Sequence, residues 1–129
     1  MRNKTKIKQL NERMINLELP NQRLVWELEG FVNSVREVIK ENRNRSGKLE
    51  VEFCEDNREW RIGATQSYQM LNSNLVGTFE VWDTFDWETP VEELVEAANR
   101  LEDEAKERQV EWAKHRMSQQ ILTDLENQN

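Results

Sequence analysis

The residues best suited to chemistry lie in one short segment, residues 82–88, where three aromatic rings and three carboxylates follow one another. The rings belong to Trp82, Phe85 and Trp87. An aromatic ring can stack on the base of a nucleotide, which stabilises a complex by about 1–3 kcal/mol per base. A tryptophan near the end of a strand can instead fill the core beneath a helix. Both interpretations are open from the sequence, and we predict that Trp82 or Phe85 faces a ligand.

Arginine side chains could form the opposite wall of such a site, because a guanidinium group both stacks on rings and binds anions. The candidates are Arg23 near the start of the second predicted helix, Arg61 in a predicted strand and Arg116 in the last predicted helix. Arg23 is favourably placed, since the backbone amides at a helix N-terminus also attract anions. These residue types indicate a ligand that combines an aromatic base with negative charge.

The sequence offers little for catalysis. A nucleophile needs an adjacent base, and the chain has one histidine, His115, and one cysteine, Cys54. His115 lies in a charged helical stretch that is typical of a surface, and Cys54 lies in a predicted strand. The acids Asp83, Asp86 and Glu88 lack the spacing of a calcium-binding loop, and neither a zinc motif nor a glycine-rich phosphate loop occurs. We therefore predict no enzymatic activity, no metal site and no cofactor.

Charge is distributed unevenly along the chain, whose net charge is −7. Residues 1–48 hold eleven basic against six acidic residues, and residues 49–129 hold seven against nineteen. Unlike ends attract, so this polarity favours a homo-oligomer, a dimer or larger. It also argues against binding to a nucleic-acid duplex, which selects a basic face.

The expected location is the cytoplasm. No apolar run approaches the ~20 residues that a membrane-spanning helix needs, and no signal peptide is recognisable. A single cysteine excludes an intramolecular disulfide and suits a reducing compartment.

Hydrophobic periodicity predicts two helices followed by three strands. The helices are expected over about residues 6–19 and 22–41, the second with Asn21 as its N-cap. A wide heptad-like apolar stripe makes the second helix the expected centre of the core and also a subunit contact. Alternating residues predict strands over 49–54, 60–64 and 75–83, with an irregular polar connection over 65–74.

The last predicted helix runs from Pro90 to about Leu125. Thr89, Pro90 and Glu92 match a capping box, with Thr89 as the N-cap. Such a helix spans about 50 Å at 1.5 Å per residue, so we expect it either to bend near residues 106–109 or to reach a second subunit. The predicted fold is α+β in a single domain over residues 1–129: N-terminal helices, a small antiparallel β-meander and a long C-terminal helix. Residues 1–5 are expected to form a frayed basic N-terminus.

The acidic first half of that helix offers an alternative function. Carboxylates along a rigid helix can imitate DNA phosphates, so the chain could be a protein-binding inhibitor or adaptor that acts through residues 90–125. A third possibility is a small structural dimer that has no pocket. The acids concerned are Glu92, Glu93, Glu96, Glu102, Asp103, Glu104 and Glu107.

The size, the order of elements, the aromatic segment, and Arg116 followed by Thr123 and Asp124 together resemble the phage anti-Thoeris sponge proteins of the first-described family. The order of helices and strands is similar over most of the chain, whereas the sequence motif itself involves only a few residues. It implies an oligomer without enzymatic activity that encloses cyclic ADP-ribose isomers in recessed pockets between subunits. An immune effector is then not switched on. Some members of that family also hold cyclic oligonucleotides.

By this resemblance, Phe85 or Trp82 and Arg116 would sandwich the adenine. Arg23 would reach the pyrophosphate, and Thr123 and Asp124 would meet the ribose or the base edge. The function implied is that the protein binds and sequesters a cyclic nucleotide immune signal without degrading it. This would block a bacterial anti-phage defence in the cytoplasm, that of the host cell if the protein is phage-encoded.

Overall fold

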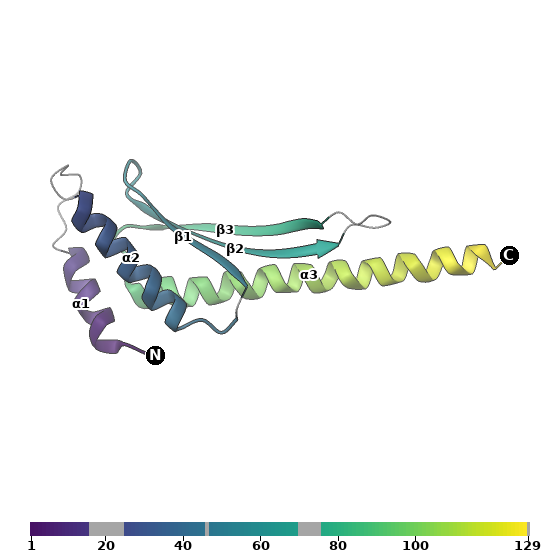
Figure 1. Ribbon diagram of the computed structural model, residues 1–129, viewed down its shortest axis with the longest axis horizontal. Coiled ribbons are helices and arrows are strands. Elements are labelled where there is room, and N and C mark those ends of the chain that lie inside the picture. The colour runs from purple at the N-terminus through teal and green to yellow at the C-terminus, as the bar shows by residue number, and fades with distance from the viewer. Residues whose placement is uncertain (16–24, 46, 70–75, 129) are drawn as a thin grey trace.

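The computed structural model describes residues 1–15, 25–45, 47–69 and 76–128 (Figure 1). The helices and strands follow one another in the order α1 (Lys4–Ile15), α2 (Val25–Glu41), β1 (Lys48–Cys54), β2 (Glu59–Gln69), β3 (Val76–Asp86) and α3 (Val91–Asn127). The predicted α+β class and the order of its elements are therefore confirmed. The predicted cap Asn21 and the candidate Arg23 lie outside the described residues.

The three strands form one antiparallel sheet in the order β1-β2-β3. Its buried side chains, which include Val51, Ile62 and Val81, share one face, because the register places Val51 opposite Ile62 and Val81 opposite Ala64. The helices cover this inner face, with α3 against β2 and β3 and with α2 against β1. The other face, which we call the outer face, carries mostly polar residues.

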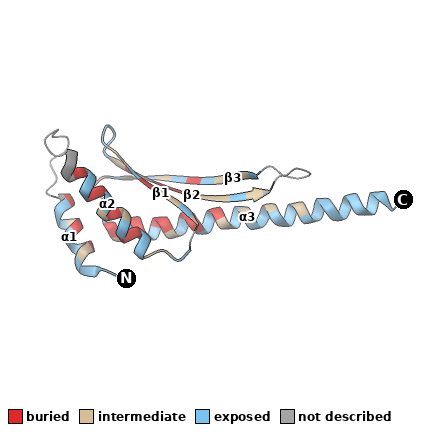
Figure 2. Ribbon diagram, in the orientation of Figure 1, coloured by how far each residue is buried: buried red, intermediate tan, exposed pale blue. Residues whose placement is uncertain are grey.

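The core lies between this inner face, α2 and the first half of α3 (Figure 2). Val35, Val38 and Ile39 of α2 are almost completely buried within the chain. The predicted burial of the second helix in the core is thus confirmed, whereas the subunit contact expected of it stays a prediction. In α3 the buried positions end at Ala105, and the helix continues without a break past the rest of the molecule (Figure 1). The expected bend near residues 106–109 is absent.

The N-terminus of α3 is capped by another helix. The predicted capping box is wrong, because Pro90 occupies the N-cap position and no side chain of the local sequence bonds to the first turn. Instead, Asn11 of α1 accepts a hydrogen bond from the Val91 amide at 2.8 Å and donates one to Glu92 Oε1 at 2.7 Å. A cap from α1 ties the first and last helices together.

Two strands are longer than their predicted ranges. β2 continues from Ala64 to Gln69, and β3 continues to Asp86, so residues 65–69 and 84–86 are strand and not loop. The polar extension of β2 pairs with β3, for example Gln66 with Phe79. Tyr68 stacks on Phe79 with ring centroids 4.4 Å apart. This aromatic contact stabilises the pairing of β2 with β3 in a segment whose other residues are mostly polar.

The N-terminal segment is held to the end of α2. The Arg2 amide donates to Asn42 Oδ1 at 2.8 Å, and the Asn3 side chain donates to a carboxylate oxygen of Glu41. These bonds oppose fraying of the first residues, and the expected fraying stays a prediction. One turn further on, the hydrogen bond between Lys6 and Glu37 raises the pKa of the lysine and lowers the pKa of the carboxyl group.

Candidate functional site

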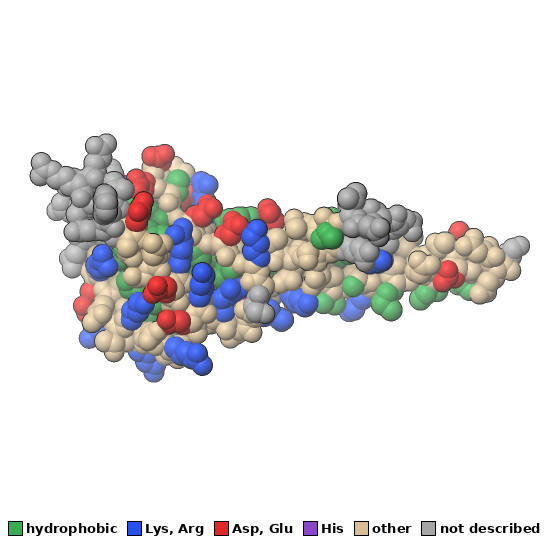
Figure 3. Space-filling view, in the orientation of Figure 1, with side chains coloured by type: hydrophobic (Ala, Val, Ile, Leu, Met, Phe, Trp, Pro, Cys, Tyr) green, Lys and Arg blue, Asp and Glu red, His purple; other side chains and the backbone are tan. Residues whose placement is uncertain are grey.

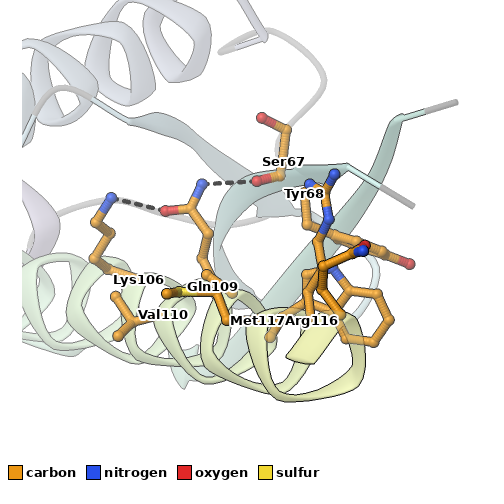
Figure 4. A pocket seen from close by; sticks show the side chains of 10 residues that line it. Ser67, Tyr68, Lys106, Gln109, Val110, Arg116 and Met117 are labelled. Carbon is orange, nitrogen blue, oxygen red and sulfur yellow. Dashed lines mark hydrogen bonds between the residues drawn. The ribbon is translucent and has the colours of Figure 1, made fainter. Parts of the chain in front are cut away.

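A groove of about 560 Å³ lies where the end of β2 crosses α3 (Figure 4). β2 contributes Ser67 and Tyr68, and α3 contributes residues one or two turns apart along one face. The residues that carry its chemistry are Tyr68, Lys106, Gln109, Trp112 and Arg116. None of the ten described residues that line the groove is acidic.

Aromatic rings form one side of the groove. Tyr68 and Trp112 meet edge to face, with ring centroids 5.1 Å apart and an interplanar angle of 66°. Tyr68 lies across β3 because its partner there is Gly77, where a Cβ atom would come within 2.4 Å of the tyrosine ring. The absence of a side chain at Gly77 therefore leaves the space that the Tyr68 ring occupies.

Polar side chains cross the groove in a short hydrogen-bonded chain. Gln109 Nε2 donates to the carbonyl oxygen of Ser67 at 2.7 Å, and Lys106 Nζ donates to Gln109 Oε1 at 2.7 Å (Figure 4). These bonds fix the amide and hold the ammonium group near one end of the groove. Arg116 lies about 15 Å further along the helix axis, so a cation stands toward each end.

Of the predicted ligand residues, the structure places Arg116 in this groove. Thr123 and Asp124 lie further along α3, exposed, with their side chains bonded within the helix. Thr123 Oγ1 donates to the Gln119 carbonyl at 2.9 Å, and Asp124 Oδ1 accepts from Gln120 at 3.0 Å.

The two predicted stacking rings lie elsewhere, on opposite faces of the sheet. Trp82 is 41% exposed on the outer face, directly over Gly63, whose Cβ would meet the indole within 2.4 Å. Phe85 is on the inner face, opposite Trp60 in the register, and packs against the core with Trp87. The three rings therefore do not share the one pocket wall that the sequence suggested.

Arg61 shares the outer face with Trp82. Its guanidinium Nη2 lies 3.5 Å from Glu59 Oε1 on the same strand. Arg61 lies six residues before Ser67 on β2, which is about 20 Å along the strand, and its side chain is on the other face of the sheet from Tyr68. The structure brings neither Trp82 nor Arg61 to Arg116.

Sequence reasoning missed most of the groove. Tyr68 was hidden in a polar run assigned to an irregular connection. Trp112 offered a signal, because an aromatic residue spaced three to four positions from Gln109 and Arg116 marks one face of a helix. The proximity of that face to the end of β2 follows only from the register and could not be read from spacing.

The acidic run of α3, on which the alternative function depends, is partly occupied within the chain. Glu102 is 1% exposed and accepts a hydrogen bond from Arg43 Nε at 2.8 Å. Asp103 pairs with Arg45 at 2.7 Å, and Glu92 accepts from Asn11. These three carboxylates are bonded within their own chain, and the other four, Glu93, Glu96, Glu104 and Glu107, are exposed on one side of the helix.

The described ranges show neither a metal site nor a membrane-spanning helix. No group of three or more histidine, cysteine or acidic side chains there could hold a metal ion. No helix in those ranges is both long and apolar enough to cross a bilayer. No family model, curated protein or solved structure matches the chain.

Proposed function

We propose that the protein binds a nucleotide in the groove between β2 and α3 and retains it unchanged. The observation that carries this proposal is the composition of the groove, which joins two aromatic rings to two cations with no carboxylate in its described lining. A base can stack on Tyr68 or Trp112, and a phosphate can bind Arg116 or Lys106. Gln109 presents an amide to the polar edge of a base or a sugar.

Retention without chemistry is supported by what the described lining contains. It has hydroxyl, amide, ammonium and guanidinium groups but no imidazole, the group that transfers protons most often, and no carboxylate, so Tyr68 and Lys106 are its only groups of a type that transfers protons in enzymes. A site of rings and cations suits binding, and binding alone is enough to remove a signal from solution.

The finer proposal is that the ligand is a cyclic ADP-ribose isomer and that its sequestration blocks a bacterial anti-phage defence. The support for it is the resemblance of the sequence to the anti-Thoeris sponge proteins, in which Arg116 is one of the residues that carry the likeness. A compact ligand with an adenine ring and a pyrophosphate has both chemical features for which the groove is suited. We further propose that the protein acts as a homo-oligomer in the cytoplasm.

Calorimetric titration of purified protein with cyclic ADP-ribose isomers and cyclic dinucleotides tests the site. Arg116→Ala should weaken binding of the retained nucleotide at least about tenfold, since a hydrogen bond to a charged group contributes about 1.5–3 kcal/mol. The matched control is Arg108→Ala, which removes an exposed arginine two turns earlier on the same helix, outside the groove. Equal affinities for the two variants would exclude the groove as the site.

A further inference from the structure

The second half of α3 carries a row of exposed apolar side chains. Val110, Met117, Ile121, Leu122 and Leu125 are each between 41% and 66% exposed. In Figure 3 hydrophobic side chains follow the lower edge of the part of α3 that extends beyond the sheet. A group of large, exposed apolar side chains on one face of a helix is typical of an interaction surface.

Most of this row points away from the chain's own sheet, and only Val110 and Met117 reach the edge of the groove. At about 100° per residue, Val110, Met117, Ile121 and Leu125 fall within about 80° of one another around the helix axis. Trp112, which contacts Tyr68 of β2, lies on the opposite side. The described part of the sheet therefore leaves most of the row uncovered. A helix in a protein derives most of its stability from packing of its apolar face.

We infer that residues 110–125 of α3 pack against the same residues of a second copy of this chain, with the two helices antiparallel. The charge distribution along α3 indicates both that the partner is a second copy of this chain and that the two helices run antiparallel. Residues 106–116 hold four basic and two acidic side chains, a net of +2, and residues 117–128 hold two acidic side chains and no basic one, a net of −2. An antiparallel pair places each positive half beside a negative half, whereas a parallel pair places like charges together.

The apolar row also matches itself in this arrangement. Its midpoint lies between Met117 and Ser118, so Val110 at one end of the row comes opposite Leu125 of the second copy. A two-fold axis through the midpoint repeats every contact, which makes the surface self-complementary. Val110 and Met117 also line the groove, so the second copy would border it. The pairing itself does not depend on the proposed function.

Analytical ultracentrifugation of the full chain tests the pairing. The wild type should sediment at twice the chain mass, and Ile121→Asp should weaken the dimer at least about a hundredfold, since an unpaired charge buried in an interface is strongly unfavourable. Gln119→Asp adds the same charge on the opposite side of the helix and should leave the dimer intact. Circular dichroism of each variant checks that the fold is kept. A monomeric wild type, or an Ile121→Asp dimer as stable as the control, would overturn the inference.

Cross-linking tests the direction of the pair. In a Cys54→Ser background, a short bismaleimide should link Met117→Cys chains to one another. It should also link Leu125→Cys chains to Val110→Cys chains when the two are mixed. Two Leu125→Cys chains should stay unlinked, because an antiparallel pair separates these positions by about 22 Å along the axis. Efficient linking of Leu125→Cys to itself would show a parallel pair and contradict the charge argument.

Discussion

Glu102 is the one charged side chain that is fully buried among the described residues, and its partner Arg43 comes from the segment that joins α2 to β1. One carboxylate oxygen accepts from Arg43, while Oε2 has no hydrogen-bond partner in the described part of the chain. A buried charge is tolerated only when it is paired. Arg43 also donates to the Gly47 carbonyl, so this one side chain fixes the entry to β1 against α3.

Replacing Arg43 should therefore be costly. Arg43→Met leaves the Glu102 carboxylate buried without its cation and should lower the free energy of unfolding by about 3–5 kcal/mol. The neighbouring pair Arg45–Asp103 is the matched control, because both side chains are about half exposed. Arg45→Met should lower it by less than about 1 kcal/mol. Urea denaturation measures both, and similar losses for the two variants would show that burial of Glu102 does not govern the interaction.

At the scale of the elements, the start of α3 depends on a residue eighty positions away. Asn11 of α1 satisfies the Val91 amide, although Thr89 has the sequence of an N-cap. The cap couples the packing of α1 to the formation of α3, because the Asn11 side chain belongs to α1 and bonds to the first turn of α3.

Two substitutions separate these roles. Asn11→Ala should destabilise the protein by about 0.5–2 kcal/mol, the usual cost of losing an N-cap. Thr89→Ala should change the stability by a few tenths of a kcal/mol, since its side chain bonds nothing in the first turn. Thermal or urea unfolding distinguishes them, and a larger loss from Thr89→Ala would restore the capping box that the sequence suggested.

The two glycine–aromatic pairs of the sheet give a matched test of where the ligand binds. Gly77→Ala would push on the Tyr68 ring in the groove, and Gly63→Ala would push on the Trp82 ring of the outer face. Each substitution should cost about 1–3 kcal/mol of stability through crowding. Only Gly77→Ala should also weaken nucleotide retention, measured by calorimetry on protein shown to be folded. Weaker retention by Gly63→Ala alone would place the ligand at Trp82, as first predicted from the sequence.

The sequence predicted what depends on local periodicity. The apolar stripe of α2, the alternation in β1 and the length of α3 all follow from side-chain spacing, and the structure has them. The cap by Asn11 and the position of Tyr68 depend on contacts between distant segments, so spacing could not supply them. Arg116 was identified by residue type, whereas its neighbours in the groove were set by the register of β2 against β3.

At the scale of the whole molecule, α3 contributes to three features of the protein through stretches that overlap along its length. Its first half closes the core (Figure 2), its middle forms one wall of the groove (Figure 4), and residues 110–125 present the exposed apolar row (Figure 3). A single rigid helix thus connects stability, the proposed binding site and the proposed contact with a second copy. The proposed contact with a second copy would account for the extension of α3 beyond the core that its first half stabilises.

The most direct test of the central claim is recovery of an intact nucleotide. Purified protein is incubated with a panel of cyclic ADP-ribose isomers, freed of unbound nucleotide by filtration, and denatured by heat, and the released nucleotide is quantified by mass spectrometry. We predict that the wild type releases at least one isomer with its mass and ring unchanged, and that Arg116→Ala releases far less. Release of an opened or hydrolysed product, or of no nucleotide from any member of the panel, would contradict the account.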